Sequence, residues 1–212
     1  MTFQEAAQEW LNRKSDPRIL TREEQHRLTA FLRGNLTPIH TGLLLSLYAG
    51  LRAGEICALQ WEDVNDQYIH VHRRMSREKA GTDAGGGKTQ LVVSELDDPR
   101  DVPLPGAFLP CLGERKKSGF VVTGIHGGPV EPRFLDVKFK EAIKKCGIGN
   151  VNFNSLRDTF AVRCIEMGVD ILCLSEILGH ASINHTVRSY GAAAGMEEKR
   201  LEMEKLSPLL PY

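Results

Sequence analysis

The stretch that decides the fold runs from Val151 to Tyr190 and reads VNFNSLRDTFAVRCIEMGVDILCLSEILGHASINHTVRSY. Apolar residues recur at helical spacing in its first part: Phe153, Leu156, Phe160, Ala161 and Cys164. This spacing predicts a helix with one face in a core. A second helix is predicted from about Asp170 to Leu178, because Gly179 is the residue type that commonly ends a helix. Two packed helices are therefore the expected centre of the fold.

Three polar residues interrupt this helical text: Arg157, His180 and Tyr190. A guanidinium group binds phosphate oxygens in pairs and keeps its charge, and an imidazole exchanges a proton near neutral pH. Tyrosine is one of the side chains that form covalent intermediates. Taken singly, an arginine on a helix is usually solvated and a histidine after a helix usually caps it. Brought together at one end of a helical core, the three form a set suited to an anionic phosphate.

The order and spacing of these residues resemble the signature of the tyrosine recombinases, the phage-integrase type of site-specific DNA recombinase. That signature is usually H-x-L-R-H-T-F-A, then L-G-H, then a tyrosine about ten residues on. Here the corresponding text is NSLRDTFA at 154–161, LGH at 178–180 and Tyr190. The family's first box, G-L-R-x-G-E, is similar to GLRAGE at 50–55, which makes Arg52 the second expected phosphate clamp.

The resemblance implies a mainly α fold with a small antiparallel β-sheet (α+β), the fold of a tyrosine recombinase catalytic domain. It also implies a site-specific recombinase or integrase from a mobile element, acting on double-stranded DNA without metal or other cofactor. Tyr190 would attack a phosphodiester and form a 3′-phosphotyrosine, while Arg52, Arg157 and His180 stabilise the charge on the phosphate. In the family a lysine on a β-hairpin protonates the leaving 5′ oxygen.

Three short segments have strand character: Tyr68–His72, Gln90–Val93 and Arg100–Leu104. They predict an antiparallel sheet in which residues 81–87, GTDAGGG, form a flexible loop between the first two strands. The hairpin tip between the second and third strands would then be Ser94–Pro99, which is acidic and contains no lysine. The nearest candidate for the hairpin lysine is Lys88, which could reach the site if the strand register is shifted.

Two positions depart from the family pattern. Position 154 is Asn where the family has His, and position 158 is Asp where the family often has His. Asn154 can hydrogen-bond a phosphate oxygen but cannot transfer a proton. An aspartate close to the anion would repel it unless Asp158 pairs with Arg157 or Arg163. Two other readings therefore stay open: a DNA-binding remnant that acts as a regulator or decoy, and a nicking-closing enzyme like the type IB topoisomerases.

Before the catalytic text, residues 2–14 predict a short amphipathic helix, and Pro17 lies in a break. A capping box formed by Thr21 and Glu24 predicts the start of the next helix. We therefore expect residues 1–18 to be a residual helix and linker, with a core-binding domain missing, and residues 19–212 to be the catalytic domain. Residues 38–50 predict a helix buried on all sides. Glu55 is expected to support an arginine or the fold rather than to perform chemistry.

After Tyr190, small residues at 191–195 form a hinge and residues 196–206 predict a tail helix. In relatives such a helix docks on a neighbouring protomer of a tetramer, which predicts self-association on DNA. A tail docked on its own chain is the alternative.

Composition fits an ordinary globular protein, with 42% apolar and 25% charged residues among 212. Because no apolar run approaches membrane length and the five cysteines show no paired spacing, we expect a cytoplasmic protein with reduced thiols. The 27 basic residues equal the 27 acidic ones, so overall charge gives no support to nucleic-acid binding. Local charge does, because residues 133–163 contain seven basic and three acidic residues. The candidate DNA-binding residues there are Arg133, Lys138, Lys140, Lys144 and Lys145.

His70 and His72 share a spacing that could bind a metal. No third ligand lies nearby in the sequence, so an exposed strand face is the favoured reading.

Overall fold

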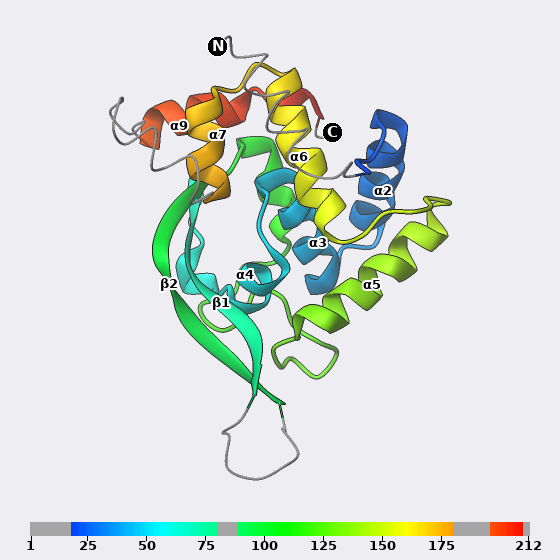
Figure 1. Cartoon of the computed structure of the whole chain (residues 1–212), viewed down its shortest axis with the longest axis vertical. Coiled ribbons are helices and arrows are strands. Elements are labelled where there is room, and N and C mark those ends of the chain that lie inside the picture. Colours follow the sequence, from blue (N-terminus) through cyan, green and yellow to red (C-terminus); the bar gives the residue numbers. More distant parts are fainter. Residues whose placement is uncertain (1–17, 80–88, 180–195, 210–212) are drawn as a thin grey trace.

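The computed structural model describes residues 18–79, 89–179 and 196–209 of the chain. Helices surround a central helix, and a long two-stranded ribbon runs along one side (Figure 1). The elements, in order, are α2 (Arg22–Gly34), α3 (Pro38–Ala49), α4 (Ala53–Ala58), η1 (Trp61–Asp63), β1 (Tyr68–Lys79), β2 (Thr89–Pro103), η2 (Gly106–Leu112), α5 (Pro132–Lys145), α6 (Asn154–Glu166), α7 (Ile171–Leu178), α9 (Met196–Glu204) and η3 (Ser207–Leu209). The predicted fold class, mainly α with a small antiparallel sheet, is confirmed.

The centre of the core is α3, as its apolar text predicts. Thr37 caps its first turn by accepting a hydrogen bond from the backbone N–H of His40, and Pro38 stands at its first position, where no backbone donor is needed. Every residue from Thr41 to Ala49 is buried. Helix α6 packs against α3 and is buried along Ser155–Cys164, so it has no solvent face, unlike the one-sided helix that its apolar spacing predicts.

Helix α2 covers one side of this pair and begins with the expected capping box. Thr21 accepts from the backbone N–H of Glu24 at 3.2 Å, and Glu24 accepts from the N–H of Thr21 at 2.9 Å. Arg163 of α6 fixes the start of this region, because its Nη2 donates to the carbonyl of Leu20 at 2.7 Å and its Nε to Gln25 at 3.0 Å. Arg163 is therefore a buried structural tie between α6 and α2.

The sheet differs from the three-stranded prediction. It has two strands, β1 and β2, because the predicted strands Gln90–Val93 and Arg100–Leu104 are parts of one strand. Ser94–Pro99 lies inside β2, so the expectation that it forms a hairpin tip was wrong. The residues that connect β1 to β2, 80–88, lie outside the described part of the chain.

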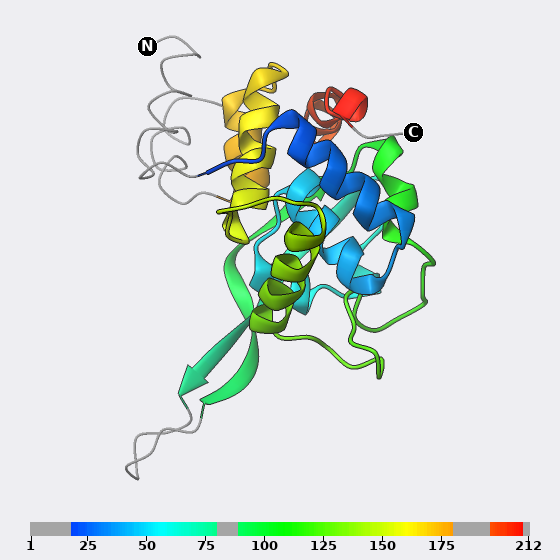
Figure 2. The ribbon, with the colours of Figure 1, turned by 90° about the vertical axis from the view of Figure 1, so that its right-hand side faces the viewer.

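Most of the acidic segment Ser94–Pro99 lies in a bulge of β2. Val71 of β1 pairs with Arg100, yet Arg73, two residues on, pairs with Glu95, so four residues of β2 stand opposite His72 alone. Turn-forming residues such as Asp97 and Pro99 therefore interrupt the ladder without ending the strand. Beyond the bulge the ribbon projects away from the helices (Figure 2).

The two histidines of β1 are paired with carboxylates. His70 Nδ1 lies 2.6 Å from Asp101, and His72 lies between Glu95 at 2.9 Å and Asp63 at 3.0 Å. The described residues contain no group of three or more His, Cys, Asp or Glu side chains arranged to hold a metal ion.

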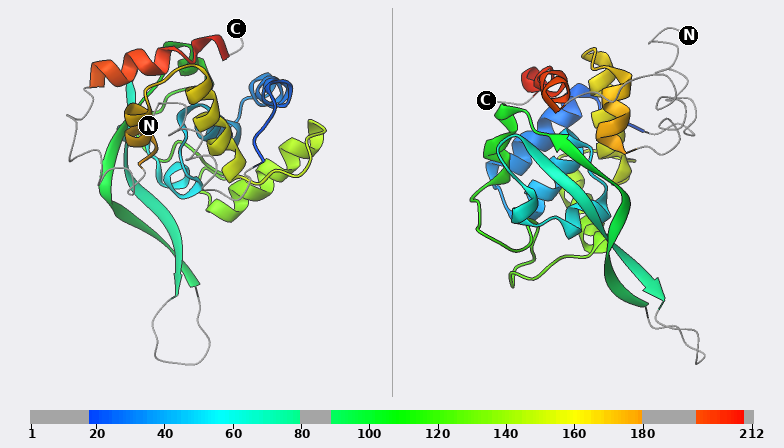
Figure 3. Two further views of the ribbon diagram at one scale, coloured as in Figure 1. Left: turned by 45° about the horizontal axis from the view of Figure 1, so that its top comes forward. Right: turned by 90° about the vertical axis from the view of Figure 1, so that its left-hand side faces the viewer.

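The described part of the tail packs on its own chain, against β2 (Figure 3). Met203 and Leu206 are buried. Glu204 accepts a hydrogen bond from the backbone N–H of Gly106 at 3.1 Å, and the Tyr48 hydroxyl donates to the carbonyl of Leu209 at 3.3 Å. In this single chain, residues 200–209 therefore adopt the self-docked alternative.

The five cysteines all lie in the described residues and form no disulfide, and four of them are buried. Burial raises the pKa of the Cys57 thiol to about 12, so this group stays protonated and unreactive at neutral pH. Among the described residues, no helix is both long and apolar enough to cross a membrane.

Candidate phosphate-binding site

A sharp turn between α3 and α4 brings Arg52 to the surface. Gly50 adopts a left-handed conformation with φ of 68°, and a Cβ atom there would lie 2.6 Å from Cδ1 of Phe160 and 2.9 Å from Cδ2 of Leu178. Only glycine fits both the backbone angle and the space. Arg52 lies two residues on and keeps 45% of its side chain exposed, although Gly50 and Leu51 before it are buried.

Glu55 is the carboxylate on which two arginines meet. It accepts hydrogen bonds from the backbone N–H and Nη1 of Arg52, at 2.9 and 2.8 Å. It also accepts from Nη1 and Nη2 of Arg100, at 3.1 and 2.8 Å. Glu55 itself is only 3% exposed. The structure therefore supports the expectation that Glu55 holds an arginine, and the backbone N–H of Arg52 that could have faced an anion is taken by this carboxylate.

The pKa of Glu55 reflects this environment. Burial acts to raise it, but the hydrogen bonds and charge of Arg100, together with those of Arg52, outweigh burial and lower the pKa to about 2. Glu55 is therefore ionised at neutral pH, and one carboxylate offsets part of the charge of two guanidinium groups.

The carboxyl end of α7 is where the arginines converge. Asp170 caps the start of this helix by accepting from the backbone N–H groups of Leu172 and Cys173, and Gly179 ends it with φ of 62°, as predicted. Three consecutive carbonyl oxygens at its end each accept from a different arginine. Arg100 Nε donates to Ile177 at 2.7 Å, Arg157 Nη2 to Leu178 at 2.5 Å and Arg52 Nη2 to Gly179 at 3.1 Å.

This arrangement follows from helix electrostatics. The last carbonyls of a helix lack partners within the helix, and its carboxyl end carries partial negative charge that attracts cations. Arg157 also donates through Nη1 to the carbonyl of Gly50, so its buried side chain joins the α3–α4 turn to the end of α7. An anion arriving here would meet the exposed Arg52, with the buried Arg157 and Arg100 fixed behind it by the fold.

Charge is concentrated in this cluster. Burial lowers the pKa of Arg157 to about 9, and the nearby charges of Arg52 and Arg100 act in the same direction, whereas Glu55 and Asp158 oppose them. Three guanidinium groups thus face two carboxylates, and an arginine with this pKa is still protonated at neutral pH. The excess positive charge favours an anionic ligand beside the exposed Arg52.

The structure brings together only part of the predicted site. Arg52 and Arg157 meet at the end of α7, as the resemblance implies, and Asn154 is exposed at the start of α6. The other three predicted catalytic residues, Lys88, His180 and Tyr190, lie outside the described residues.

Arg100 is a site residue that sequence reasoning missed. It shares a face of β2 with the buried Val102, and only 9% of its own side chain is exposed. A charged group on the inward face of a strand needs a buried partner. The inward position of Arg100 was therefore the available signal in the sequence that it belongs to a site, and Glu55 on the buried side of α4 was the candidate partner.

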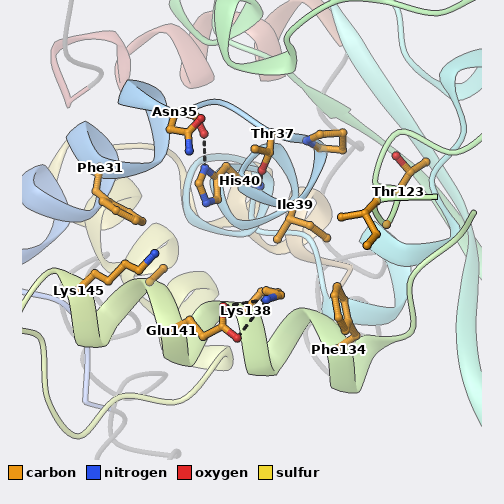
Figure 4. A pocket seen from close by; sticks show the side chains of 14 residues that line it. Phe31, Asn35, Thr37, Ile39, His40, Thr123, Phe134, Lys138, Glu141 and Lys145 are labelled. Carbon is orange, nitrogen blue, oxygen red and sulfur yellow. Dashed lines mark hydrogen bonds and ion pairs between the residues drawn. The ribbon is translucent and has the colours of Figure 1, made fainter. Parts of the chain in front are cut away.

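The predicted DNA-binding residues of α5 occupy two sides of the helix. Arg133, Lys140 and Lys144 are exposed and spaced seven and four residues apart, which puts them on one face. Lys138 is turned by about 140° from Arg133 around the helix, and Lys145 by about 120°. Both line a pocket of about 440 Å³ between α5 and the α2–α3 turn (Figure 4). Lys138 pairs there with Glu141 at 2.8 Å, and Lys145 lies 5.6 Å from the ring centre of Phe31.

Comparison with known proteins now connects this geometry to a family. Residues 18–196 match the sequence model of the phage integrase family. The tyrosine recombinase XerA of Pyrococcus horikoshii is 31% identical over 180 residues, which are 82% of this chain and 56% of that protein. The chain spans about half of the length of the curated relatives it matches.

Solved structures support the fold. The integrase of mycobacterium phage Brujita aligns with a TM-score of 0.66 at 18% identity, covering 94% of this chain and 65% of that one. The Tn1549 transposon integrase, solved in complex with circular intermediate DNA, aligns with a TM-score of 0.64 at 21% identity, covering 90% of this chain and 66% of that one. With the family match over residues 18–196 and two of its expected arginines joined at the end of α7, this chain belongs to the phage integrase family.

Proposed function

We propose that the chain is the catalytic domain of a site-specific DNA recombinase that cuts and rejoins strands through a 3′-phosphotyrosine intermediate. The observation that carries the proposal is the meeting of Arg52 and Arg157, 105 residues apart in the sequence (157 − 52), at the carboxyl end of α7. His180, the proposed third phosphate contact, is the residue after Gly179.

The proposed reaction is a phosphoryl transfer without a metal ion. The phenol oxygen of Tyr190 attacks the phosphorus, the bond to the 5′ oxygen breaks, and the phenol proton passes to water. Lys88 is proposed to give a proton to the leaving oxygen, which becomes a 5′ hydroxyl. The 5′ hydroxyl of a partner strand then attacks the phosphotyrosine and releases the tyrosine, so that one ester bond replaces another and no ATP is needed.

The two described arginines would contribute differently. Arg157 is buried and its Nη1 and Nη2 already donate to the carbonyls of Gly50 and Leu178, so it acts mainly as a fixed positive charge behind the phosphate. Arg52 is nearly half exposed and can direct N–H groups at a nonbridging oxygen. Fixed charge of this kind, aimed at where charge develops, is usually the largest contribution to such catalysis.

The test uses a nicked suicide DNA duplex that releases a short fragment on cleavage, so that the covalent protein–DNA adduct accumulates. We expect an adduct that survives denaturation and is absent in Tyr190→Phe, which has the same fold but no nucleophile. Wild-type protein that visibly retards the DNA and forms no adduct at high concentration would contradict the proposal.

A second candidate, a DNA-binding remnant that regulates or competes with an active recombinase, is favoured by one observation. Position 154 carries asparagine in place of the family's histidine. This candidate predicts retarded DNA without an adduct. An adduct accompanied by relaxation of supercoiled plasmid, with no strand exchange between two sites, would indicate the nicking-closing reading.

Double-stranded DNA is the proposed partner, and α5 supplies the proposed contacts: Arg133, Lys138, Lys140, Lys144 and Lys145. Self-association through the tail on DNA is also proposed; it requires the self-docked residues 200–209 to leave their own chain. Five cysteines, all in the described residues and without a disulfide, support a reducing compartment, so we propose a cytoplasmic location. The division into residues 1–18 and a catalytic domain at 19–212 stays a prediction.

A further inference from the structure

Arg100 stands out because its contacts join three elements and none of them is explained by the proposed chemistry. Its Nη1 and Nη2 hold both oxygens of Glu55, and its Nε holds the carbonyl of Ile177. A Cβ atom at Gly179 would lie 3.1 Å from Cδ and Nη1 of Arg100, so the end of α7 rests directly on this side chain. With 9% of its side chain exposed, Arg100 lies behind Arg52 and does not reach the surface as Arg52 does.

We propose that Arg100 is a positioning residue for DNA strand cleavage, which holds Arg52 and the carboxyl end of α7 in the geometry that a bound phosphate requires. The inference rests on the proposed function. It adds a role for a strand residue that does not touch the phosphate and acts through Glu55 and through the backbone of Ile177.

The first route runs through Glu55. This carboxylate binds Arg52 on one side and Arg100 on the other, so the direction of the Arg52 side chain depends on a carboxylate that Arg100 keeps in place and ionised. Without Arg100, Glu55 would be a buried carboxylate with Arg52 as its remaining hydrogen-bonded guanidinium. Arg52 would then be drawn further toward Glu55, away from an incoming phosphate.

The second route runs through α7. The chain from Ile177 to Gly179 leads directly into His180, the proposed third phosphate contact. Arg100, Arg157 and Arg52 fix one carbonyl each along these three residues. Losing the Arg100 contact frees the first of the three carbonyls and leaves space under Gly179. Because a displacement of about 1 Å in a catalytic group can cost about a hundredfold in rate, a small shift here suffices to slow cleavage.

The test compares Arg100→Met, which keeps the length and apolar volume of the side chain, with Arg100→Lys, which keeps the charge. The matched control is Arg73→Met. Arg73 of β1 donates to both oxygens of Asp63, at 2.9 and 2.7 Å, and is 19% exposed, so it forms a similar arginine–carboxylate pair whose hydrogen bonds go to η1 and not to α7. Thermal unfolding and DNA affinity are measured for each, so that losses of folding or binding are seen separately.

The first readout needs no activity. Amide hydrogen exchange at Gly179 and the preceding residues is expected to accelerate about tenfold or more in Arg100→Met, as loss of a charged hydrogen bond to a partly buried carbonyl implies. Arg73→Met is expected to leave exchange there unchanged. Unchanged exchange at the end of α7 in Arg100→Met would overturn the inference, whether or not the wild-type protein cleaves DNA.

The second readout is the single-turnover rate of adduct formation on suicide DNA. We expect Arg100→Met to bind DNA within about threefold of wild type, because it removes no surface charge, and to cleave about a hundredfold more slowly. Arg100→Lys is expected to recover part of the rate. Wild-type protein that forms no adduct contradicts the proposed function, whereas an Arg100→Met rate equal to that of wild type contradicts this inference alone.

The pH profile separates positioning from simple destabilisation. The charged groups around Glu55 are Arg52 on its own helix, Arg100 on β2 and Arg157 on α6, and α7 contributes backbone carbonyls. Removing Arg100 takes away the main favourable partner and raises the pKa of Glu55. The rate of Arg100→Met should therefore fall relative to wild type as the pH is lowered toward about 5, whereas Arg73→Met should keep the wild-type profile.

Discussion

Glu55→Gln tests the electrostatics of the site most directly. The folded state lowers the pKa of Glu55 from 4.5 to about 2, because the hydrogen bonds and charges of Arg100 and Arg52 outweigh burial. A lowered pKa stabilises the folded state above the unfolded pKa, and this stability is lost as the pH falls through the folded pKa. At about 1.36 kcal/mol for each pH unit, the carboxylate contributes about 3 kcal/mol at neutral pH.

The expected measurement follows from this linkage. At neutral pH, Glu55→Gln should unfold in urea with a free energy about 3 kcal/mol below that of wild type. By about pH 3, some 2 kcal/mol of this difference should have disappeared, because Glu55 of the unfolded wild-type chain binds a proton there while the folded carboxylate stays mostly ionised. The control, Glu114→Gln, removes the same charge from an exposed position and should shift stability by less than about 0.5 kcal/mol. A difference between wild type and Glu55→Gln that stays constant from pH 7 to about pH 3 would refute the reasoning.

Three further outcomes are expected. In Gly50→Ala the alanine must adopt a left-handed backbone and its Cβ atom clashes with Phe160, so the unfolding free energy should fall by about 2–5 kcal/mol. The control Gly34→Ala, at an open helix end, should be neutral or stabilising. Equal effects of the two substitutions in urea titrations would contradict the geometry. Met203→Ala should cost about 2–5 kcal/mol if the tail packs on its own chain in solution, and a wild-type melting curve would argue against that docking. Arg133, Lys140 and Lys144 are the three exposed cations on one face of α5. Replacing all three with neutral residues should flatten the slope of log affinity for DNA against log salt concentration by about 2.7. An unchanged slope would place the DNA elsewhere.

The helical part of the fold could be predicted because its signals are local. A few residues are enough to recognise each of three signals: the buried run of α3, the capping box before α2 and the glycine that ends α7. The meeting of Arg52 and Arg157 was predicted from the family pattern, since nothing local to either residue points to the other. Lys88, His180 and Tyr190 keep their predicted roles as proposals.

The sheet and Arg100 could not be predicted for a different physical reason. Asp97 and Pro99 have turn chemistry, yet the pairing of Arg73 with Glu95 and of Val71 with Arg100 on either side holds them in a bulge. Whether turn-forming residues end a strand depends on the pairing that the partner strand provides on either side. The sequence of the segment itself does not contain this information. The partners of Arg100 likewise lie 45 and 77 residues away in the chain.

The three arginine hydrogen bonds at the end of α7 have a consequence for how the protein folds. They close sequence separations of 127, 77 and 21 residues, so they draw on α4, β2 and α6 at once. Closing loops of this length costs chain entropy, so we expect the three contacts to form only after α4, β2 and α6 have come together. A growing or half-folded chain would therefore lack the assembled arginine cluster. The arginine cluster on which the proposed DNA cleavage depends would then exist only in the finished molecule.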